Sequence, residues 1–332
     1  MTAFTPLLQA FFTDRLVTQR HASSNTIAAY RDTFKLLLTY IQAETGTPPS
    51  ALDIGDLDAT CIGGFLTHLE RVRGNSARTR NARLAAIHSL FSYAALRHPE
   101  HADTIARVLA IPTARIQRNL VTWLIDTEVT ALLGACDPDT RTGRRDHAMF
   151  ALAIQTGLRV SELTGLTIAD IRTGTGAHVH CVGKGRKERA TPLLPDTVAI
   201  VSAWIAERAA AAATDSLFAT TTGRRLSRDA IEARLRIATA RAAGSCPSLA
   251  GKNVTAHTLR HTAAMRLLHA GVDATVIALW LGHEQVATTS IYIHADMTIK
   301  ENAIAKTTPP GTAASTPRYQ PDDALIAFLE RL

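Results

Sequence analysis

The chain has 332 residues, of which 46% are hydrophobic and 20% are charged, and its formal net charge is +7. This composition excludes a largely disordered, collagen-like or low-complexity protein, and the length predicts two domains. The sequence contains no apolar run of about 18 residues and begins without a secretory signal, so we expect a cytoplasmic protein that has no membrane partner.

The N-terminal part, residues 1–110, is predicted to be a helical domain. Apolar residues recur at helical spacing between Ile27 and Ile41, and a Gly-Pro break at 46–49 ends that helix. We expect Asp56 to cap the next helix, and a further helix is expected over residues 76–97.

Three arginines lie near the start of that last helix, with no acidic residue between them: Arg78, Arg80 and Arg83. Residues 70–118 as a whole carry nine basic and three acidic side chains. A solvated helix face is one interpretation, and contact with nucleic-acid phosphates is the other. We favour phosphate contact, because surface helices often pair their charges at i,i+4 and affinity for nucleic acid comes from such clusters.

The next segment, residues 111–121, shows no apolar periodicity and contains a proline and two arginines, so it is the predicted linker. Helices are expected again over 126–135 and 144–156. A change of period then predicts a basic β-hairpin over 178–193, and helices return from about residue 195 into the 290s.

The C-terminal tail has two parts. Residues 307–321 are rich in Thr, Pro, Ala and Ser and are predicted to be extended. Residues 322–332 regain a helical period with an apolar stripe of Leu325, Phe328, Leu329 and Leu332. A stripe that short is not stable alone, so we expect this helix to dock on another surface.

Four segments carry polar groups in apolar or glycine-containing surroundings. They are Thr156–Leu163, Gly183–Gly185, His257–His261 and the stretch from Leu281 to Tyr292.

Each segment has a plain alternative when it is considered alone. Arg159 forms a structural pair with Glu162 or binds an anion, and Lys184 is a solvated turn lysine or a contact to a DNA backbone. His257 and Arg260, at i and i+3, share one helix face, so both can reach one anion.

A zinc site is the alternative for His257 and His261, which lie at i and i+4. Thr258 stands where the H-E-x-x-H motif has its catalytic glutamate, and no cysteine lies at a helpful spacing, so we predict no metal. His283 taken alone is as readily a core residue as a catalytic one, and a lone tyrosine such as Tyr292 is more often a core residue than a catalytic one.

Taken together, the four segments resemble the tyrosine recombinase (phage integrase) family, which includes Xer-type recombinases and integron integrases. The family's catalytic set of Arg, Lys, His-x-x-Arg, His or Trp, and Tyr falls on Arg159, Lys184, His257, Arg260, His283 and Tyr292. Four sequence motifs are typical of the family's core: TGLRVSEL, GKGRKER, HTLRHT and LGHE. The resemblance is strong over residues 119–300 and weaker over the N-terminal half.

The resemblance implies a mainly α fold with a small β-hairpin or sheet, an α+β arrangement that closes on DNA as a C-shaped clamp. The implied domains are a helical, SAM-like core-binding domain over 1–110, a linker over 111–121, a catalytic domain over 122–306, and a linker with a C-terminal docking helix over 307–332.

The resemblance also implies a reaction. Tyr292 is the nucleophile that forms a 3′-phosphotyrosyl bond, Lys184 is the general acid, and Arg159 and Arg260 bind the phosphate. Glu162 is a candidate for orienting Arg159. No metal or other cofactor is implied, because the covalent bond conserves the energy of the broken strand.

The partner implied is double-stranded DNA with inverted-repeat core sites. Arg186, Lys187 and Arg189 of the hairpin join the three arginines of residues 76–97 as predicted DNA contacts. Strand exchange through a Holliday junction implies a homotetramer in the synaptic complex, and the helix at 322–332 is the segment that family members exchange between protomers. The protein is then expected at the nucleoid.

Several biological roles share this chemistry. The segment of about 40 residues beyond Tyr292 favours a mobile-element recombinase for integration or transposition. Xer-type dimer resolution and plasmid resolution are the alternatives. A type IB topoisomerase fits less well, because the sequence around Arg159 resembles that of recombinases. A catalytically silent DNA-binding protein also fits less well, because all six catalytic positions are present.

Overall fold

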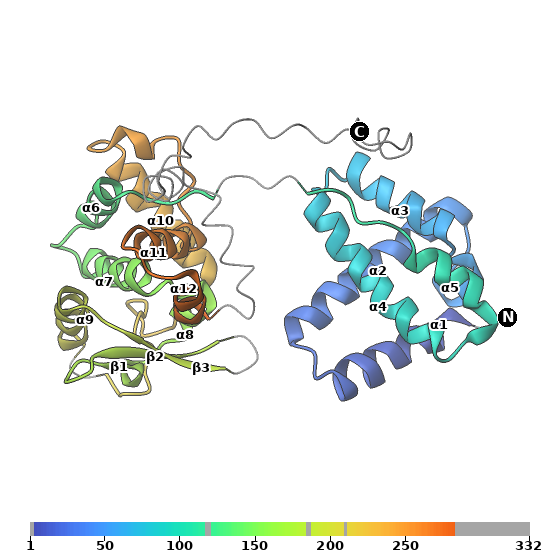
Figure 1. Cartoon of the computed structure of the whole chain (residues 1–332), viewed down its shortest axis with the longest axis horizontal. Helices are drawn as coiled ribbons and strands as arrows, with labels where there is room; N and C mark the ends of the chain where they lie inside the picture. The colour runs from blue at the N-terminus through green and yellow to red at the C-terminus, as the bar shows by residue number, and fades with distance from the viewer. Residues whose placement is uncertain (1–2, 117–120, 184–186, 209–210, 283–332) are drawn as a thin grey trace, which may run out of the picture. The chain divides into compact units, whose positions relative to one another are not determined.

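The computed structural model describes residues 3–116, 121–183, 187–208 and 211–282. The chain divides into two compact units, Met1–Asn119 and Leu120–Leu332. The predicted fold class is confirmed, since both units are built from helices and the second also contains a small antiparallel sheet (Figure 1). No described helix is long and apolar enough to cross a membrane.

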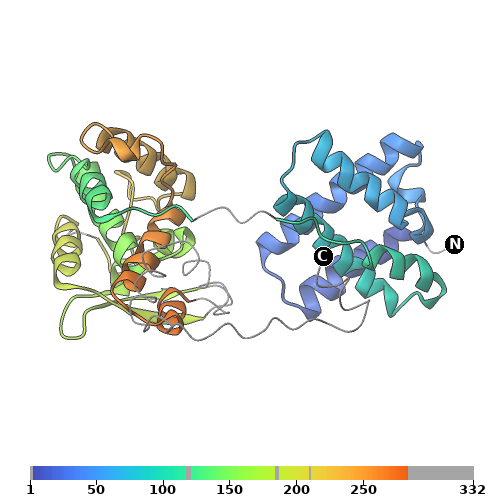
Figure 2. The same ribbon diagram turned by 45° about the horizontal axis from the view of Figure 1, so that its top comes forward.

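The first unit is a bundle of helices around one apolar core, as the two views in Figures 1 and 2 show. Its helices are α1 (Phe4–Ala10), a π-helical segment (Phe11–Gln19), α2 (Ser24–Thr45), α3 (Ala59–Arg71), α4 (Ala77–Ala95) and α5 (Ala102–Leu109). Phe11 lies at the centre of an aromatic cluster, where its ring is within about 6 Å of the rings of Tyr30, Phe34 and Tyr93.

The start of α3 differs from the prediction. Asp58, and not Asp56, is the N-cap, and its carboxylate accepts a hydrogen bond from the Cys61 amide at 2.7 Å. Asp56 instead ends a one-turn 3-10 helix (Ile54–Asp56), where its side chain accepts from the Asp53 amide. The preceding turn has therefore already used the carboxylate that the sequence pattern assigned to the longer helix.

In the second unit, helices come both before and after the sheet along the chain. Its elements are α6 (Asp126–Gly134), α7 (Arg141–Thr156), α8 (Val160–Gly165), β1 (Ile171–Arg172), β2 (His178–Val182), β3 (Glu188–Pro192), α9 (Pro195–Ala206), α10 (Arg228–Ala242), α11 (Ala256–His269) and α12 (Ala274–Leu281). Helix α11 packs against α7, α10 and α12, so it lies in the interior of the unit (Figure 1).

The sheet has the order β1-β2-β3 and is antiparallel throughout. The predicted hairpin is confirmed as β2 and β3, and β1 is a strand that the sequence pattern did not indicate. The prediction of helices from about residue 195 onward is wrong between α9 and α10. There the described chain runs irregularly and forms isolated bridges, Thr167 to Ser216 and Ala219 to Arg225, because a Thr-rich turn with Gly223 at φ 81° interrupts the helical pattern.

Gly157 ends α7 and brings it close to α12. Its φ is +65°, a conformation that glycine adopts without strain. A Cβ atom at this position would lie 2.4 Å from Cδ2 of Leu281 and 3.2 Å from Cβ of Ala263. The turn that leads from α7 to Arg159 therefore depends on the absence of a side chain.

Replacing Gly157 with alanine is expected to destabilise the second unit more than the matched change Gly271→Ala. Both glycines have positive φ, but a Cβ at Gly271 meets nothing within 4 Å, so only Gly157→Ala adds a packing clash, worth about 1–3 kcal/mol. Urea unfolding followed by tryptophan fluorescence measures this, because Trp123, Trp204 and Trp280 all belong to the second unit. Equal unfolding midpoints for the two variants would contradict the close approach.

Candidate active site

Arg159 occupies the N-cap position of α8, directly after the turn at Gly157. Glu162, three residues on, completes a capping box: its Oε2 accepts from the Arg159 amide at 2.7 Å, and its Oε1 accepts from Nη1 of Arg159 at 2.8 Å. The Glu162 side chain is 3% exposed, whereas that of Arg159 is 33% exposed. The buried carboxylate thus holds Nη1 of the guanidinium, and a third of the Arg159 side chain stays exposed.

Arg260 lies on α11 and is buried, with 2% of its surface exposed. Its Nη1 donates to the Gly157 carbonyl at 2.6 Å, and its Nη2 donates to the Leu281 carbonyl at 2.7 Å. Nη2 of Arg159 donates to the next carbonyl, that of Gly282, at 2.8 Å. The two arginines are therefore brought together by consecutive carbonyls at the C-terminal end of α12, where the helix dipole favours positive charge.

His257 lies one turn before Arg260 on the same helix, as the spacing predicts. Its ring centroid is 4.2 Å from that of His261. Burial lowers the pKa of His257, and the positive charges of Arg260 and Arg159 lower it further. The imidazole is therefore held neutral near pH 7, where it can donate one hydrogen bond and exchange a proton.

These side chains line a hollow of about 340 Å³. The residues around it are Arg159, Val160, Ser161, Arg228, Glu232, Ala256, His257 and Arg260. Three guanidinium groups border the hollow, and Glu232, the carboxylate beside them, accepts from the Ala256 amide with both oxygens at 3.3 Å. An anion such as a phosphodiester matches this surplus of donors and positive charge.

Arg228 and Glu232 were not predicted as site residues. Both lie on α10, and the sequence contains no local motif that links them to Arg159. Arg228 follows the N-cap Ser227, so the only available signal was a cation beside a capping residue, which is common on surface helices.

The hairpin brings Arg189 into the same cluster. Nη1 and Nη2 of Arg189 donate to Oε1 and Oε2 of Glu162 at 3.0 and 2.7 Å, and the Arg189 side chain is only 13% exposed. This geometry favours a structural role for Arg189 over the predicted phosphate contact. Lys187, just before β3, is exposed. The predicted residues Lys184, Arg186, His283 and Tyr292 lie outside the described part of the chain.

The predicted DNA-binding arginines of α4 differ from one another. Arg78 is exposed, whereas Arg80 has a side chain that is 14% exposed and lies 3.5 Å from the carboxylate of Glu70. Burial, followed by the charge of Arg73, lowers the pKa of Arg83. Glu70 lies before α4 in the sequence. Arg80 therefore has an acidic partner although no acidic residue stands between the three arginines. Contact of this face with DNA stays a prediction.

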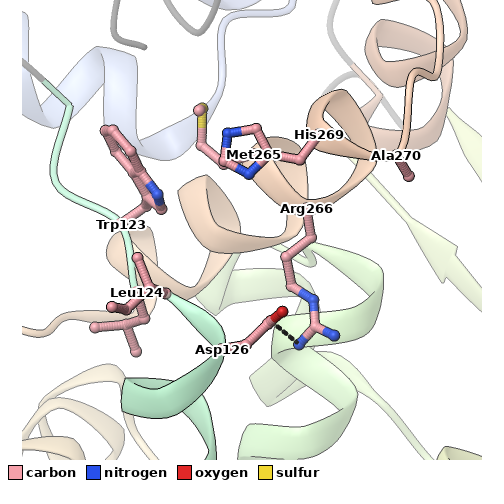
Figure 3. A pocket seen from close by; sticks show the side chains of 8 residues that line it. Trp123, Leu124, Asp126, Met265, Arg266, His269 and Ala270 are labelled. Atoms are coloured by element: carbon pink, nitrogen blue, oxygen red, sulfur yellow. Dashed lines mark ion pairs between the residues drawn. The ribbon is translucent and has the colours of Figure 1, made fainter. Parts of the chain in front are cut away.

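A second hollow, of about 370 Å³, lies at the side of the unit formed by the start of α6 and the end of α11. Figure 3 shows Trp123, Leu124 and Met265 around it, with the ion pair between Arg266 and Asp126 beside them at 3.5 Å. It shares no lining residue with the arginine-lined hollow. Its mixed apolar and polar lining contains no concentration of cations suited to a phosphate.

The pKa of His257 in the DNA-free protein is expected to lie below its ordinary value of about 6.5 and to rise in Arg159→Gln, because one of the two neighbouring positive charges is removed. NMR titration of the imidazole signals checks this, with Arg172→Gln as a control that removes an exposed charge from β1. A pKa of His257 that does not respond to Arg159→Gln would show that the two side chains are not electrostatically coupled.

Comparison with known proteins identifies the family of the chain. The phage integrase family model matches residues 122–298, and the model of the phage integrase N-terminal SAM-like domain matches residues 10–98. An integrase/recombinase of Sinorhizobium fredii is 50% identical over 327 residues, which cover 98% of both chains. The tyrosine recombinase XerC of Pelobacter propionicus is 32% identical, over 88% of this chain and 92% of the relative.

Two groups of solved structures share the fold. The XerH site-specific recombinase bound to palindromic difH substrate aligns with a TM-score of 0.69 at 23% identity, over 86% of this chain and 81% of that chain. The Tn1549 transposon integrase in complex with circular intermediate DNA aligns with a TM-score of 0.69 at 16% identity, over 92% of this chain and 99% of that chain. With a family model that covers more than half of its length and relatives that span nearly all of it, the chain belongs to the phage integrase family of tyrosine recombinases.

Proposed function

We propose that the protein is a site-specific DNA recombinase that cuts and rejoins strands through a covalent bond between Tyr292 and a DNA 3′-phosphate. The observation that carries the proposal is the hollow lined by Arg159, Arg260 and His257, beside which both arginines donate to carbonyls at the C-terminal end of α12. The sequence places His283 directly after the second of those carbonyl-bearing residues, Gly282, and Tyr292 nine residues later.

The proposed reaction is an in-line displacement at phosphorus. The phenolic oxygen of Tyr292 attacks, the bond from phosphorus to the 5′-oxygen breaks, and Lys184 gives that oxygen a proton as it leaves. The phenolic proton passes to His257, which is neutral, or to solvent. Arg159 and Arg260 donate to the non-bridging oxygens, where negative charge grows in the transition state.

Resealing reverses these steps on another strand. A 5′-hydroxyl attacks the phosphorus, its proton passes to Lys184, and the bond from phosphorus to Tyr292 breaks. The released phenolate takes back a proton from His257 or from solvent. The energy of the original phosphodiester is kept in the phosphotyrosyl bond, so the proposed cycle needs no nucleotide or metal cofactor.

The proposed substrate is double-stranded DNA with inverted-repeat core sites. The exposed cations Arg78 and Lys187, with Arg80, Arg83 and Arg186, supply contacts to the DNA backbone, which set affinity without reading sequence. Action on chromosomal or mobile-element DNA then takes place in the cytoplasm, at the nucleoid.

For the biological role, we propose integration or transposition of a mobile element. The support is the segment of about 40 residues after Tyr292 and the full-length match to an integrase/recombinase of Sinorhizobium fredii. Xer-type dimer resolution or plasmid resolution is the alternative, because XerC and XerD proteins are also among the relatives. A topoisomerase or a silent DNA-binding protein is disfavoured by these same relatives and by the complete set of six residues.

Tyr292→Phe is expected to abolish covalent attachment to DNA and to leave site binding at the wild-type level, because only the nucleophilic oxygen is removed. Denaturing gel electrophoresis of labelled core-site DNA measures the adduct, and gel-shift titration measures binding. Arg260→Ala is the companion variant and is expected to slow cleavage by about 10²–10³-fold. A covalent adduct retained by Tyr292→Phe would refute the assigned nucleophile.

We further propose that four protomers act together, with residues 322–332 of one protomer docked on its neighbour. The apolar stripe Leu325, Phe328, Leu329 and Leu332 needs such a surface, and a cyclic exchange joins identical protomers through one repeated contact.

Truncation after Thr307 is expected to keep binding of one core site and to lose synapsis of two sites and the coupled cleavage that depends on it. Native gel electrophoresis with two labelled sites of different length measures synapsis, and the full chain is the control. Unaltered synapsis by the truncated protein would contradict the docking proposal without affecting the catalytic one.

A further inference from the structure

Arg189 on β3 joins three segments at one point. Its guanidinium forms both hydrogen bonds to Glu162 of α8, as described above. A Cβ on Gly282 would lie 2.9 Å from Nη1 of Arg189, and one on Gly183 would lie 3.4 Å from the same atom. The guanidinium is therefore enclosed between Gly183 of the hairpin and Gly282 at the end of α12, with Glu162 facing its edge.

This enclosure controls where the hairpin turn starts. Gly183 donates from its amide to the Lys187 carbonyl at 2.7 Å, which closes the strand pair next to the turn. Lys184 follows Gly183 in the sequence, so a shift of Gly183 against Arg189 also shifts the backbone to which the lysine is joined.

Arg189 and Glu162 are both charged and both largely buried, so the ion pair between them is a rigid link. Burial raises the pKa of Glu162, but hydrogen bonds from Arg189 and from the Arg159 amide outweigh it, and the carboxylate stays ionised. Burial likewise lowers the pKa of Arg189, and the bond to Glu162 outweighs it. A bidentate pair between two ionised groups with side chains that are 13% and 3% exposed permits little movement of the strand.

We propose that Arg189 is a positioning residue for the general acid: by tying the base of the hairpin to Glu162, it fixes Lys184 relative to Arg159. The inference rests on the proposed role of Lys184. Arg189 itself touches neither DNA nor the reacting atoms in this scheme, which distinguishes it from the exposed Lys187.

The test compares two substrates. One is core-site DNA with the ordinary 5′-oxygen at the cleaved bond, and the other has sulfur at that bridging position. A thiol has a pKa of about 8.5, so a thiolate leaves without being protonated and cleavage of the sulfur substrate needs no general acid. Variants are Arg189→Gln, Arg189→Lys and Lys184→Ala, with Arg172→Gln as the matched control for loss of a charge from the same sheet.

Arg189→Gln is expected to cleave the oxygen substrate about 10²-fold more slowly than the wild type, because a misplaced acid loses most of its effect. On the sulfur substrate its rate is expected to return close to that of the wild type, as for Lys184→Ala. Arg189→Lys is expected to be intermediate on the oxygen substrate, since an ammonium group keeps the charge but cannot form two parallel hydrogen bonds. Arg172→Gln is expected to match the wild type on both.

Two further measurements separate positioning from other roles. If Arg189 contacted a phosphate, its loss would reduce the slope of log affinity against log salt concentration by about one, whereas positioning leaves the slope unchanged. The thermal unfolding midpoint of each variant is measured first, and Arg189→Lys, which retains the charge opposite Glu162, carries the comparison should Arg189→Gln fail to fold.

The outcomes that overturn the inference are distinct. If Lys184→Ala recovers on the sulfur substrate and the Arg189 variant does not, Arg189 acts on Arg159 and not on the hairpin. A reduced salt slope would return Arg189 to the DNA contacts. If Lys184→Ala itself does not recover, the general-acid assignment in the proposed function fails, and with it the basis of the inference.

Discussion

The structure of the catalytic unit depends on one buried charge, the carboxylate of Glu162. It accepts two hydrogen bonds from Arg159 and two from Arg189, and its side chain is 3% exposed. Removing one partner from such a buried pair typically costs about 3–5 kcal/mol, because the remaining charge has no water to solvate it. Glu162 therefore links the start of α8 to the base of the β2-β3 hairpin.

The two arginines of the hollow also combine a structural role with the proposed catalytic one. Arg260 bonds the carbonyls of Gly157 and Leu281, and Arg159 bonds that of Gly282. These bonds use one part of each guanidinium to fix the backbone and to keep the other part oriented. A donor fixed before the substrate arrives has no reorganisation to undergo during the reaction, which is the condition for strong stabilisation of transition-state charge. The groups that orient the two guanidiniums in this way are backbone carbonyls, which a side-chain substitution does not remove.

Charge in this protein is used in two ways, and its net value of +7 conceals the difference. Several cations are paired or buried, as Arg80 is beside Glu70 and Arg189 is beside Glu162. Others, such as Arg78 and Lys187, are exposed. An exposed cation releases counterions from a DNA backbone more readily than a cation that is already paired with a carboxylate, so a count of basic residues overstates the binding surface.

Motif spacing and helical periodicity determined the family, the helical bundle before residue 110, the hairpin, and the shared face of His257 and Arg260, because each is decided by residues close in sequence. Tertiary structure alone decided that Arg189 pairs with Glu162, that Glu70 meets Arg80, and that Arg228 lines the same hollow as Arg159. Each of these arrangements brings together residues of different elements, and a basic residue shows the same local pattern whether it faces solvent or a carboxylate. The cap of α3 differed from expectation because the preceding turn uses the carboxylate of Asp56, and the segment before α10 differed because a Thr-rich turn at Gly223 interrupts the helical pattern.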